Sequence, residues 1–364
     1  MNWTEQQSAA LKAVEDWYKS KPRKQIFRVF GYAGVGKTSL AKYFAETINN
    51  DVMYAAYTGK AALMMRNNGC TGASTIHSLI YKIQEDDDGS VKFKLNKHSP
   101  LRNIGLLVID ECSMVDKDLA EDILSFGKPV LVLGDPAQLP PVSGAGYFTN
   151  ADPDVMLTEI HRQAKDNPIV YLATQVREGF KLKPGVYGES VISSTIDAIE
   201  PLVEFDQVIV GRNNTRTGLN ATIRDMLGYM GPMPQTNDRL ICLKNDKTVS
   251  ILNGEMFTVK DIIPNKSPYY GMYKLLDVDT SEKTVRARVH NSFFDPAVTK
   301  PNTLYLKGSQ EFDYGYAITC HKSQGSQWNS VLIFDESWCF REDAKRWLYT
   351  AITRAQTKIL MYQT

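Results

Sequence analysis

The segment GYAGVGKT (residues 31–38) has the residue types and the spacing of a loop that binds nucleotide phosphates. It follows an apolar run and precedes a helical stretch, so backbone N–H groups at the start of that helix would point towards a bound anion. Lys37 adds a positive charge for the β- and γ-phosphates, and Thr38 offers a hydroxyl to Mg²⁺. We expect nucleotide contacts from Gly31, Gly34, Gly36, Lys37, Thr38 and Ser39.

Two adjacent carboxylates end a second apolar run, in IDECSM (residues 109–114). Asp110 has the place of an aspartate that holds the Mg²⁺ shell, and Glu111 that of a general base that polarises the attacking water. Neighbouring side chains of a strand point in opposite directions, so both carboxylates can face the nucleotide only if the strand ends there. Together with the phosphate-binding loop, the pair predicts hydrolysis of ATP with Mg²⁺ as cofactor.

The elements that must position these side chains alternate between apolar runs and helical stretches. Short apolar runs separated by helices are typical of buried parallel strands in an α/β sheet. A second alternation of the same kind begins near residue 165. We expect strands at residues 26–30, 52–57, 104–110 and 129–135 in the first unit, and at residues 207–210, 331–335 and 358–362 in the second.

A hairpin is expected within the first unit. Residues 81–84 and 91–95 flank the turn residues Asp88 and Gly89, and the apolar residues of the second run alternate with lysines. The tip, EDDDGS, is strongly acidic.

A small antiparallel β module, residues 245–308, is expected within the second unit. Its run KTVRARVH alternates apolar with polar side chains, which is the period of a strand with one buried face. Arg286, Arg288 and His290 would then share the outer face, where they either contact a nucleic acid or are merely solvated.

Composition excludes several classes of protein. The net charge is only +1, so any nucleic-acid site must be a local groove balanced by acidic residues elsewhere. The five cysteines are scattered, which suggests reduced, partly buried thiols and not a zinc site. The N-terminal stretch lacks an apolar core, and no apolar run reaches the length of a membrane span. We therefore expect a cytoplasmic protein (host cytoplasm if viral) with no membrane partner.

Four further segments follow IDECSM in order and make a resemblance specific. They are GDPAQLPPV (134–142), LTEIHRQA (157–164), CHKSQGSQW (320–328) and LYTAITRAQ (348–356). The set resembles superfamily 1 helicases, and within them the RecD-like and phage Dda-like enzymes of superfamily 1B, which move 5′ to 3′.

The resemblance implies an α/β fold with two RecA-like P-loop lobes. The first lobe would be residues 1–164, with a pin hairpin at about 81–100. The second would be residues 165–244 and 309–364, interrupted at 245–308 by a small SH3-like β barrel.

The resemblance also implies roles around the nucleotide. Gln7, in WTEQQ (3–7), would read the adenine, although a polar cap of the first helix is the alternative. Gln138 would sense the γ-phosphate. Arg162 and Arg354 would clamp it, since planar guanidinium groups suit phosphoryl oxygens. Arg354 would reach the nucleotide from the second lobe, which couples hydrolysis to closure of the cleft.

A track for single-stranded DNA is implied along both lobes, although helix caps and loop hydrogen bonds would explain the same residues. The sequence departs from the family pattern at Tyr57, where a proline is usual, and at Gln327, where many RecD-like chains have glutamate. The track residues would be Thr58, Lys60, Thr75, His77, His321, Lys322, Ser323 and Gln324.

The hairpin lies where related enzymes carry a strand-splitting pin. Phe93 would then stack against a base at the fork, and an exposed decorative hairpin is the alternative.

The function implied is an ATP-dependent DNA helicase that works as a monomer on single-stranded and forked DNA. Single-strand-binding or replication proteins would be further partners. Three rivals remain open: a translocase that unwinds poorly, an RNA motor, and a non-catalytic P-loop module. Intact Lys37, Glu111, Arg162 and Arg354 argue against the last.

Overall fold

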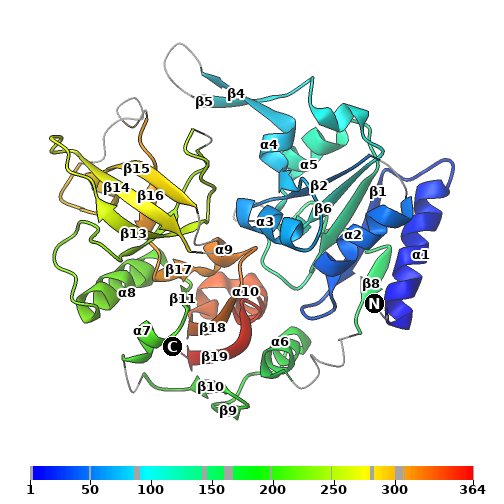
Figure 1. The fold of residues 1–364 in the computed structure, drawn as a ribbon. Coiled ribbons are helices and arrows are strands. Elements are labelled where there is room, and N and C mark those ends of the chain that lie inside the picture. Colours follow the sequence, from blue (N-terminus) through cyan, green and yellow to red (C-terminus); the bar gives the residue numbers. More distant parts are fainter. Residues whose placement is uncertain are drawn as a thin grey trace.

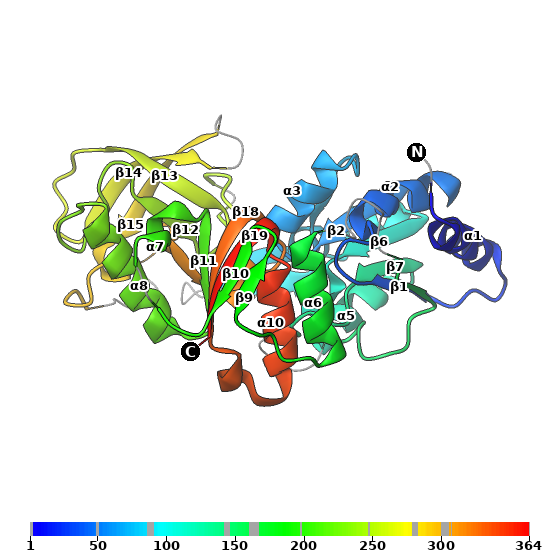
Figure 2. The same ribbon diagram turned by 90° about the horizontal axis from the view of Figure 1, so that it is seen from below.

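The computed structural model describes residues 3–48, 51–85, 91–141, 146–159, 167–196, 199–246, 248–278, 283–299, 306 and 308–363. Its named strands form three larger sheets and one two-stranded hairpin. Figure 1 shows the first sheet with its helices on one side of the molecule and the small third sheet on the other. The second sheet stands between them, and the view from below in Figure 2 gives the same order.

The first sheet contains six parallel strands in the order β3-β2-β6-β7-β1-β8. All residues of β6 and β7 are buried, as expected for central strands of a sheet covered on both faces. The apolar runs at residues 26–30, 52–57, 104–110 and 129–135 correspond to four of these strands, and the two short strands at residues 74–75 and 155–157 were not predicted. The strands are β1 (Ile26–Gly31), β2 (Val52–Ala56), β3 (Ser74–Thr75), β6 (Leu106–Asp110), β7 (Val130–Gly134) and β8 (Val155–Leu157).

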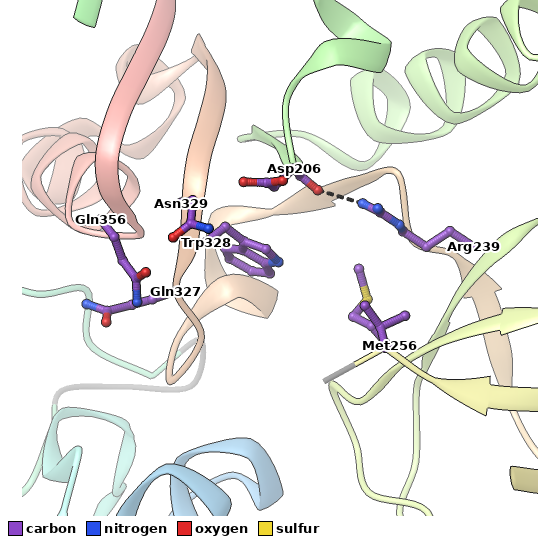
Figure 3. A pocket seen from close by; sticks show the side chains of 8 residues that line it. Asp206, Arg239, Met256, Gln327, Trp328, Asn329 and Gln356 are labelled. Atoms are coloured by element: carbon purple, nitrogen blue, oxygen red, sulfur yellow. Dashed lines mark hydrogen bonds between the residues drawn. The ribbon is translucent and has the colours of Figure 1, made fainter. Parts of the chain in front are cut away.

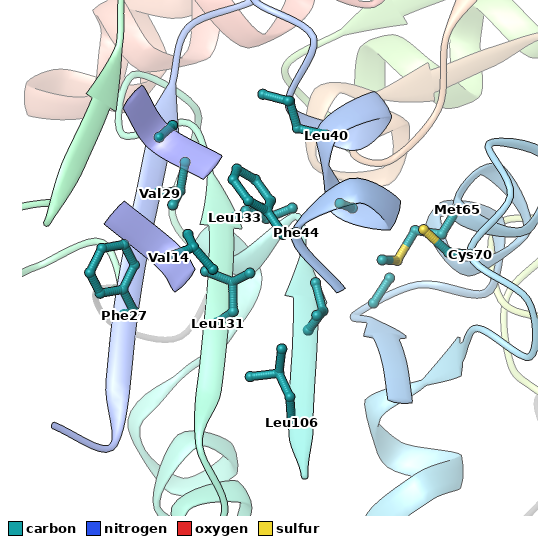
Figure 4. Close-up of a cluster of buried hydrophobic side chains, with 14 of the residues drawn as sticks. Val14, Phe27, Val29, Leu40, Phe44, Met65, Cys70, Leu106, Leu131 and Leu133 are labelled. Carbon is teal, nitrogen blue, oxygen red and sulfur yellow. The ribbon is translucent and has the colours of Figure 1, made fainter. Parts of the chain in front are cut away.

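Helices cover both faces of this sheet and enclose two apolar cores. One core joins the apolar sides of α1 and α2 to the strands through Val14, Phe27, Phe44 and Leu131 (Figure 4). The other packs α4 and α5 on the opposite face, around Ile109. The helices are α1 (Glu5–Lys19), α2 (Lys37–Ile48), α3 (Gly59–Asn67), α4 (Ile76–Ile80) and α5 (Lys117–Leu124), with short 3₁₀ turns η1 (Pro100–Asn103) and η2 (Cys112–Met114).

The second sheet has the order β17-β11-β18-β19-β10-β9, and only β9 runs antiparallel to its neighbour among the pairings described. Trp347 and Ile333 are fully buried in its core. The strands are β9 (Gly185–Tyr187), β10 (Ser190–Ser193), β11 (Gln207–Val210), β17 (Ala317–Thr319), β18 (Trp328–Asp335) and β19 (Ala355–Gln363). The helices are α6 (Pro168–Glu178), α7 (Pro201–Glu204), α8 (Asn213–Met226), α9 (Cys320–Ser323), α10 (Ala344–Ile352) and the 3₁₀ segment η6 (Ser337–Asp343).

The third sheet is antiparallel, in the order β15-β14-β13-β12-β16. It begins and ends outside the predicted range 245–308, because its own core recruits a strand from each side. A bridge between Val289 and Gln310 brings the far edge back towards β16. The strands are β12 (Arg239–Cys242), β13 (Met256–Ile262), β14 (Tyr270–Asp277), β15 (Thr284–His290) and β16 (Phe312–Tyr314), followed in chain order after β15 by η4 (Asn291–Phe293).

The alternation predicted for β15 holds except at its end. Arg286 and Arg288 are exposed, and the guanidinium of Arg288 lies 3.8 Å from the ring centroid of Tyr270. His290 is only 4% exposed, so its placement on the outer face was wrong. Its ring packs edge-on against Tyr270 and its Nδ1 lies 2.7 Å from the Ser292 hydroxyl, because the chain turns into η4 there.

The predicted hairpin is present as β4 (Tyr81–Glu85) and β5 (Val91–Leu95), paired from Tyr81 with Leu95 to Glu85 with Val91. Figure 1 shows it extending away from the first sheet. Its tip, residues 86–90, and the side chain of Phe93 lie outside what the structure describes.

Four of the five cysteines are buried, and all five are free, in agreement with the expectation of reduced thiols. Within the described ranges, no helix has the length and apolar character needed to cross a membrane.

Candidate functional site

The phosphate-binding loop joins β1 to α2. Gly34 and Gly36 have φ angles of +83° and +79°, which glycine adopts without strain. A Cβ at Gly31 would lie 2.6 Å from Val35 Cγ2, so this position also admits only glycine. Lys37 Nζ donates to the Tyr32 carbonyl oxygen at 3.0 Å, which folds the ammonium group back over the loop. Ser39 lies in the first turn of α2.

The two carboxylates sit where β6 stops. The strand ends at Asp110, and Glu111 adopts a left-handed conformation with φ +52°, so the alternation of strand side chains is broken as the prediction required. Thr38 Oγ1 donates to Asp110 Oδ2 at 2.8 Å, and the Glu111 N–H donates to Asp110 Oδ1 at 2.8 Å. The strand end and the phosphate-binding loop therefore meet directly.

The oxygen atoms of Thr38 and Asp110 are hard ligands of the kind that Mg²⁺ prefers, and they already lie together. No cluster of three or more His, Cys, Asp or Glu residues that could hold a metal exists in the described part of the chain. The pair fits a cation that takes its remaining ligands from phosphate and water, as Mg²⁺ does beside nucleotides.

Charged side chains of both lobes affect the pKa values of these two carboxylates. Burial raises the pKa of Asp110 and of Glu111, and the positive charge of Arg354 lowers that of Glu111. Arg354 is 2% exposed, and its guanidinium donates to the carbonyl oxygens of Thr350 (3.1 Å) and Ser326 (3.2 Å). Arg354 of the second lobe thus lies close enough to influence the proposed general base of the first.

Gln138 precedes Leu139, whose N–H donates to Thr350 Oγ1 of the second lobe at 2.9 Å. Gln138 is 7% exposed, and its amide oxygen has no hydrogen-bond partner among the described residues. A buried, unpaired acceptor is costly in a folded protein, which fits a ligand or water that pairs with it. Arg162, the other predicted phosphate clamp, lies outside the described residues.

Gln7 links the first helix to the loop. Thr4 is the N-cap of α1, and Gln7 Oε1 accepts from the Thr4 N–H at 3.0 Å in a capping box. Gln7 Nε2 donates to the Val35 carbonyl oxygen at 3.1 Å. Gln7 therefore has the helix-capping role of the alternative interpretation, and it also contacts the phosphate-binding loop.

Tyr349 is a site residue that the sequence interpretation missed. Its hydroxyl accepts from the Ala33 N–H of the loop at 2.9 Å and donates to Asp135 Oδ2 at 2.6 Å, although it comes from α10 of the second lobe. Burial and the nearby Asp135 raise its pKa well above the usual value, so the hydroxyl stays protonated. Tyr349 lies within LYTAITRAQ, where only Arg354 had drawn attention.

Arg177 makes a second contact from the second lobe to the loop. Its guanidinium lies 3.7 Å from the ring centroid of Tyr32. Arg177, Lys345 and Arg346 line a pocket of about 260 Å³ beside Tyr32 and Tyr349. The second lobe therefore places three cationic side chains next to the phosphate-binding loop.

Two of the four predicted DNA residues of the first lobe, both threonines, cap helices. Thr58 Oγ1 accepts from the Ala61 N–H at the start of α3, and Thr75 Oγ1 accepts from the Ser78 N–H at the start of α4. The ring of His77 lies 5.6 Å from that of Tyr57, and burial lowers the pKa of His77. These threonines play the structural role that the alternative named.

The predicted residues of the second lobe divide into two groups. His321 and Lys322 are accessible, and Lys322 Nζ donates to Asn253 Oδ1 of the third sheet at 3.1 Å. Ser323 and Gln324 are 0% and 3% exposed. Ser323 Oγ donates to the Cys320 carbonyl oxygen, and Gln324 Nε2 donates across the lobes to the Leu139 carbonyl oxygen at 2.8 Å. In this conformation the side chains of Ser323 and Gln324 are buried and donate hydrogen bonds within the protein.

Three units converge where α3 meets α9. A Cβ at Gly325 would lie 2.7 Å from Thr58 Oγ1, and Lys60 Nζ lies 5.0 Å from the ring centroid of Trp328. The turn of residues 252–255 in the third sheet, which we call the 252–255 turn, reaches both helices. A Cβ at Gly59 would lie 2.4 Å from Leu252 Cδ1, while Asn253 binds Lys322.

A pocket of about 270 Å³ lies near this junction (Figure 3). Gln327 and Trp328 enter it from the start of β18, and Met256 enters it from the third sheet. Gln327, one of the two departures from the family pattern, is exposed, with Nε2 3.5 Å from the Thr353 carbonyl oxygen.

Comparisons with known proteins agree with this arrangement. Residues 3–186 match a family described as an AAA domain, and residues 314–362 match one described as a UvrD-like helicase C-terminal domain. The chain is 30% identical over 344 residues to the ATP-dependent RecD2 DNA helicase of Deinococcus radiodurans, a match that covers 90% of this chain and 45% of that protein. It is 27% identical over 308 residues to the ATP-dependent DNA helicase dda of phage T4, covering 77% and 64%. The chain thus spans less than two thirds of either relative.

Solved structures show the same fold over the whole chain. A structure of two Pif1 helicases at forked double-stranded DNA matches with a TM-score of 0.63 and 22% identity, covering 100% of this chain and 92% of that one. The Bacteroides Pif1 helicase with ADP-AlF₃ and single-stranded DNA matches with a TM-score of 0.60 and 20% identity, covering 100% and 94%. The first and second sheets, with their helices, therefore have the fold of RecA-type lobes.

Proposed function

Because the chain belongs to the superfamily 1B helicases, we propose that it is an ATP-dependent DNA helicase that moves 5′ to 3′ along single-stranded DNA and unwinds a fork. Two of its relatives are named as ATP-dependent DNA helicases. Its structural neighbours include a Pif1 structure described as the basis for DNA unwinding at forked double-stranded DNA, and the Bacteroides Pif1 helicase with ADP-AlF₃ and single-stranded DNA. The polarity and the fork activity rest on this membership and on the motif wording.

The observation that carries the proposal is the meeting of both lobes at one nucleotide site. The charge of Arg354 acts on Glu111, and the Tyr349 hydroxyl joins Ala33 to Asp135. A change at the phosphates would therefore change the contact between the lobes. Such coupling is what a motor needs and what a simple nucleotide-binding module lacks.

Each side chain has a chemical task in this proposal. Lys37 would neutralise the phosphates, while Thr38 and Asp110 would hold Mg²⁺, which neutralises phosphate charge when bound. Glu111 would take a proton from the attacking water. Gln138 would report the state of the γ-phosphate, and Arg162 and Arg354 would stabilise the charge of the transferring group.

We also propose the remaining features as a set. The first lobe is residues 1–164 and the second residues 165–244 and 309–364, with a β module between them and a hairpin pin in the first lobe. The protein would act as a monomer in the cytoplasm, on single-stranded and forked DNA, with single-strand-binding or replication proteins as partners.

Forked duplexes with one single-stranded tail test the proposal. Unwinding should require a 5′ tail, and efficient unwinding from a 3′ tail alone would refute the polarity. Lys37→Ala should abolish ATP turnover, whereas Glu111→Gln should keep nucleotide binding and lose hydrolysis. Near-normal hydrolysis by Glu111→Gln would exclude Glu111 as the base, and stimulation of the ATPase by RNA but not by DNA homopolymers would identify an RNA motor.

A further inference from the structure

Two side chains outside the predicted track lie together at the carboxyl edge of the second sheet. Strands β11 and β18 are parallel neighbours, so their carboxyl ends are adjacent. Arg212 follows β11, and Trp338 follows β18. The Arg212 guanidinium lies 5.3 Å from the centroid of the Trp338 ring. The indole is exposed nonetheless, with 59% of the residue's surface accessible.

Glu336 holds this pair in place. It is 2% exposed and accepts hydrogen bonds from the N–H groups of Gly211 and Arg212, both at 2.8 Å. Its other oxygen accepts from Arg212 Nε at 2.7 Å and from Thr215 Oγ1 at 2.6 Å. Two of the four donors, the N–H group and the guanidinium Nε, belong to Arg212, so the carboxylate restrains both the backbone and the side chain of this arginine before any ligand arrives.

The pair borders a pocket of about 520 Å³ that is large enough for a nucleobase. Phe334 and Ile196 give it apolar walls, and the Glu336 charge is neutralised by Arg212. Flat aromatic rings stack on indole and guanidinium planes through dispersion and cation–π attraction, without reading base identity.

The pocket continues the predicted DNA track. A Cβ at Gly211 would lie 3.0 Å from Phe340 Cε2, so Gly211 and Phe340 are in close contact. The ring of Phe340 in turn lies 5.7 Å from that of His321. One side chain therefore separates Arg212 and Trp338 from the accessible end of α9.

We infer that Trp338 and Arg212 form a stacking subsite for a base of single-stranded DNA, beyond His321 on the second-lobe side of the track. The inference rests on the proposed function, since it needs a strand on the track. The subsite would hold the strand while the contacts between the lobes are remade.

Anisotropy of labelled oligo(dT), without nucleotide, tests the subsite with intact strands and with strands that carry abasic residues at one end or the other. Alanine substitution of a stacking aromatic weakens single-strand binding by about 5- to 100-fold. Trp338→Ala should weaken binding of the intact strand within this range. Trp338→Phe should recover most of it, and Phe180→Ala, which removes another exposed aromatic outside the pocket, should change nothing.

The abasic strands separate stacking from other effects. Wild-type protein should lose affinity when the bases are missing at one end only, and Trp338→Ala should be insensitive to that change. Unchanged affinity of Trp338→Ala, or an equal loss for intact and abasic strands, would overturn the subsite and leave the pocket to a protein partner. If the wild type fails to bind single-stranded DNA at all, the proposed function fails first. Circular dichroism and the thermal unfolding midpoint of Trp338→Ala should match those of the wild type, which shows that the variant is folded.

Discussion

Arg354 belongs to the second lobe, where its hydrogen bonds lie, and its positive charge lowers the pKa of Glu111 in the first lobe. We expect Arg354→Ala to slow hydrolysis by about 10³-fold or more, the scale for loss of an arginine finger. With the positive charge gone, the pKa of Glu111 rises further. The acidic limb of the pH–rate profile should therefore move to higher pH, since the base must be deprotonated to act.

The matched variant is Arg354→Lys, which keeps the charge but loses the planar fork of donors. It should keep the position of the acidic limb and still turn over slowly. Loss of DNA binding with intact ATPase in Arg354→Ala would place the residue in the DNA track instead.

Tyr349 is predicted to transmit closure of the lobes to the phosphate-binding loop. Tyr349→Phe keeps the buried ring and removes the hydroxyl, which leaves Asp135 Oδ2 and the Ala33 N–H without this partner. A hydrogen bond to a charged group contributes about 1.5–3 kcal/mol, so kcat should fall by roughly 10- to 100-fold.

DNA affinity without nucleotide should not change in Tyr349→Phe. Tyr314→Phe, which removes a hydroxyl bond to the Pro232 carbonyl oxygen in the third sheet, is the control and should keep normal turnover. Turnover of Tyr349→Phe at the wild-type level would show that the contact is only structural.

At the scale of elements, the β4–β5 hairpin is the proposed wedge. Opening one base-pair step costs roughly 1.4 kcal/mol, so a fork end frays unaided and a rigid wedge need only block re-closure. Replacement of residues 84–92 by a short Gly-Ser turn should abolish fork unwinding. DNA-stimulated ATPase and translocation on single strands should stay nearly intact.

If the shortened protein unwinds forks as fast as the parent, the hairpin has no role in strand separation. The splitting edge would then lie in the third sheet, where Arg286 and Arg288 are exposed. Arg286→Ala combined with Arg288→Ala is the variant that distinguishes the two.

Elements with a strong local signal were predictable from the sequence. The longer strands of both lobes follow from short apolar runs, whereas the short strands β3, β8, β9, β10 and β17 were not predicted. The turn after Asp110 follows from the need of two carboxylates to share a site. The chemistry of Tyr349, Gln324 and His290 was not predictable, because each depends on a partner distant in the sequence or on where the chain turns. The limits of the third sheet were missed for the same reason, since β12 and β16 join it only through pairing.

Over the whole molecule, the net charge is only +1, and the predicted track residues include only two lysines, Lys60 and Lys322. These charges imply weak, short-range attraction to the DNA backbone. Phosphate contacts set the slope of affinity against salt, so a protein that makes few of them shows a shallow slope. Shape complementarity and base stacking would then contribute more to DNA affinity than charge does.

The 252–255 turn determines how single-stranded DNA could enter the predicted track. Leu252 packs against α3 and Asn253 binds α9, while Glu255 anchors the turn through an ion pair of 3.0 Å with Lys283. The turn thus bridges the first and second lobes at the predicted DNA track. We expect single-stranded DNA to pass beneath this bridge, where it can be threaded from a free end but cannot enter from the side. Closed single-stranded circles should therefore load more slowly than linear strands of equal length, in stopped-flow binding, and Leu252→Ala should remove the difference. Equal loading rates of circular and linear strands on the wild-type protein would mean that the 252–255 turn detaches faster than DNA binds.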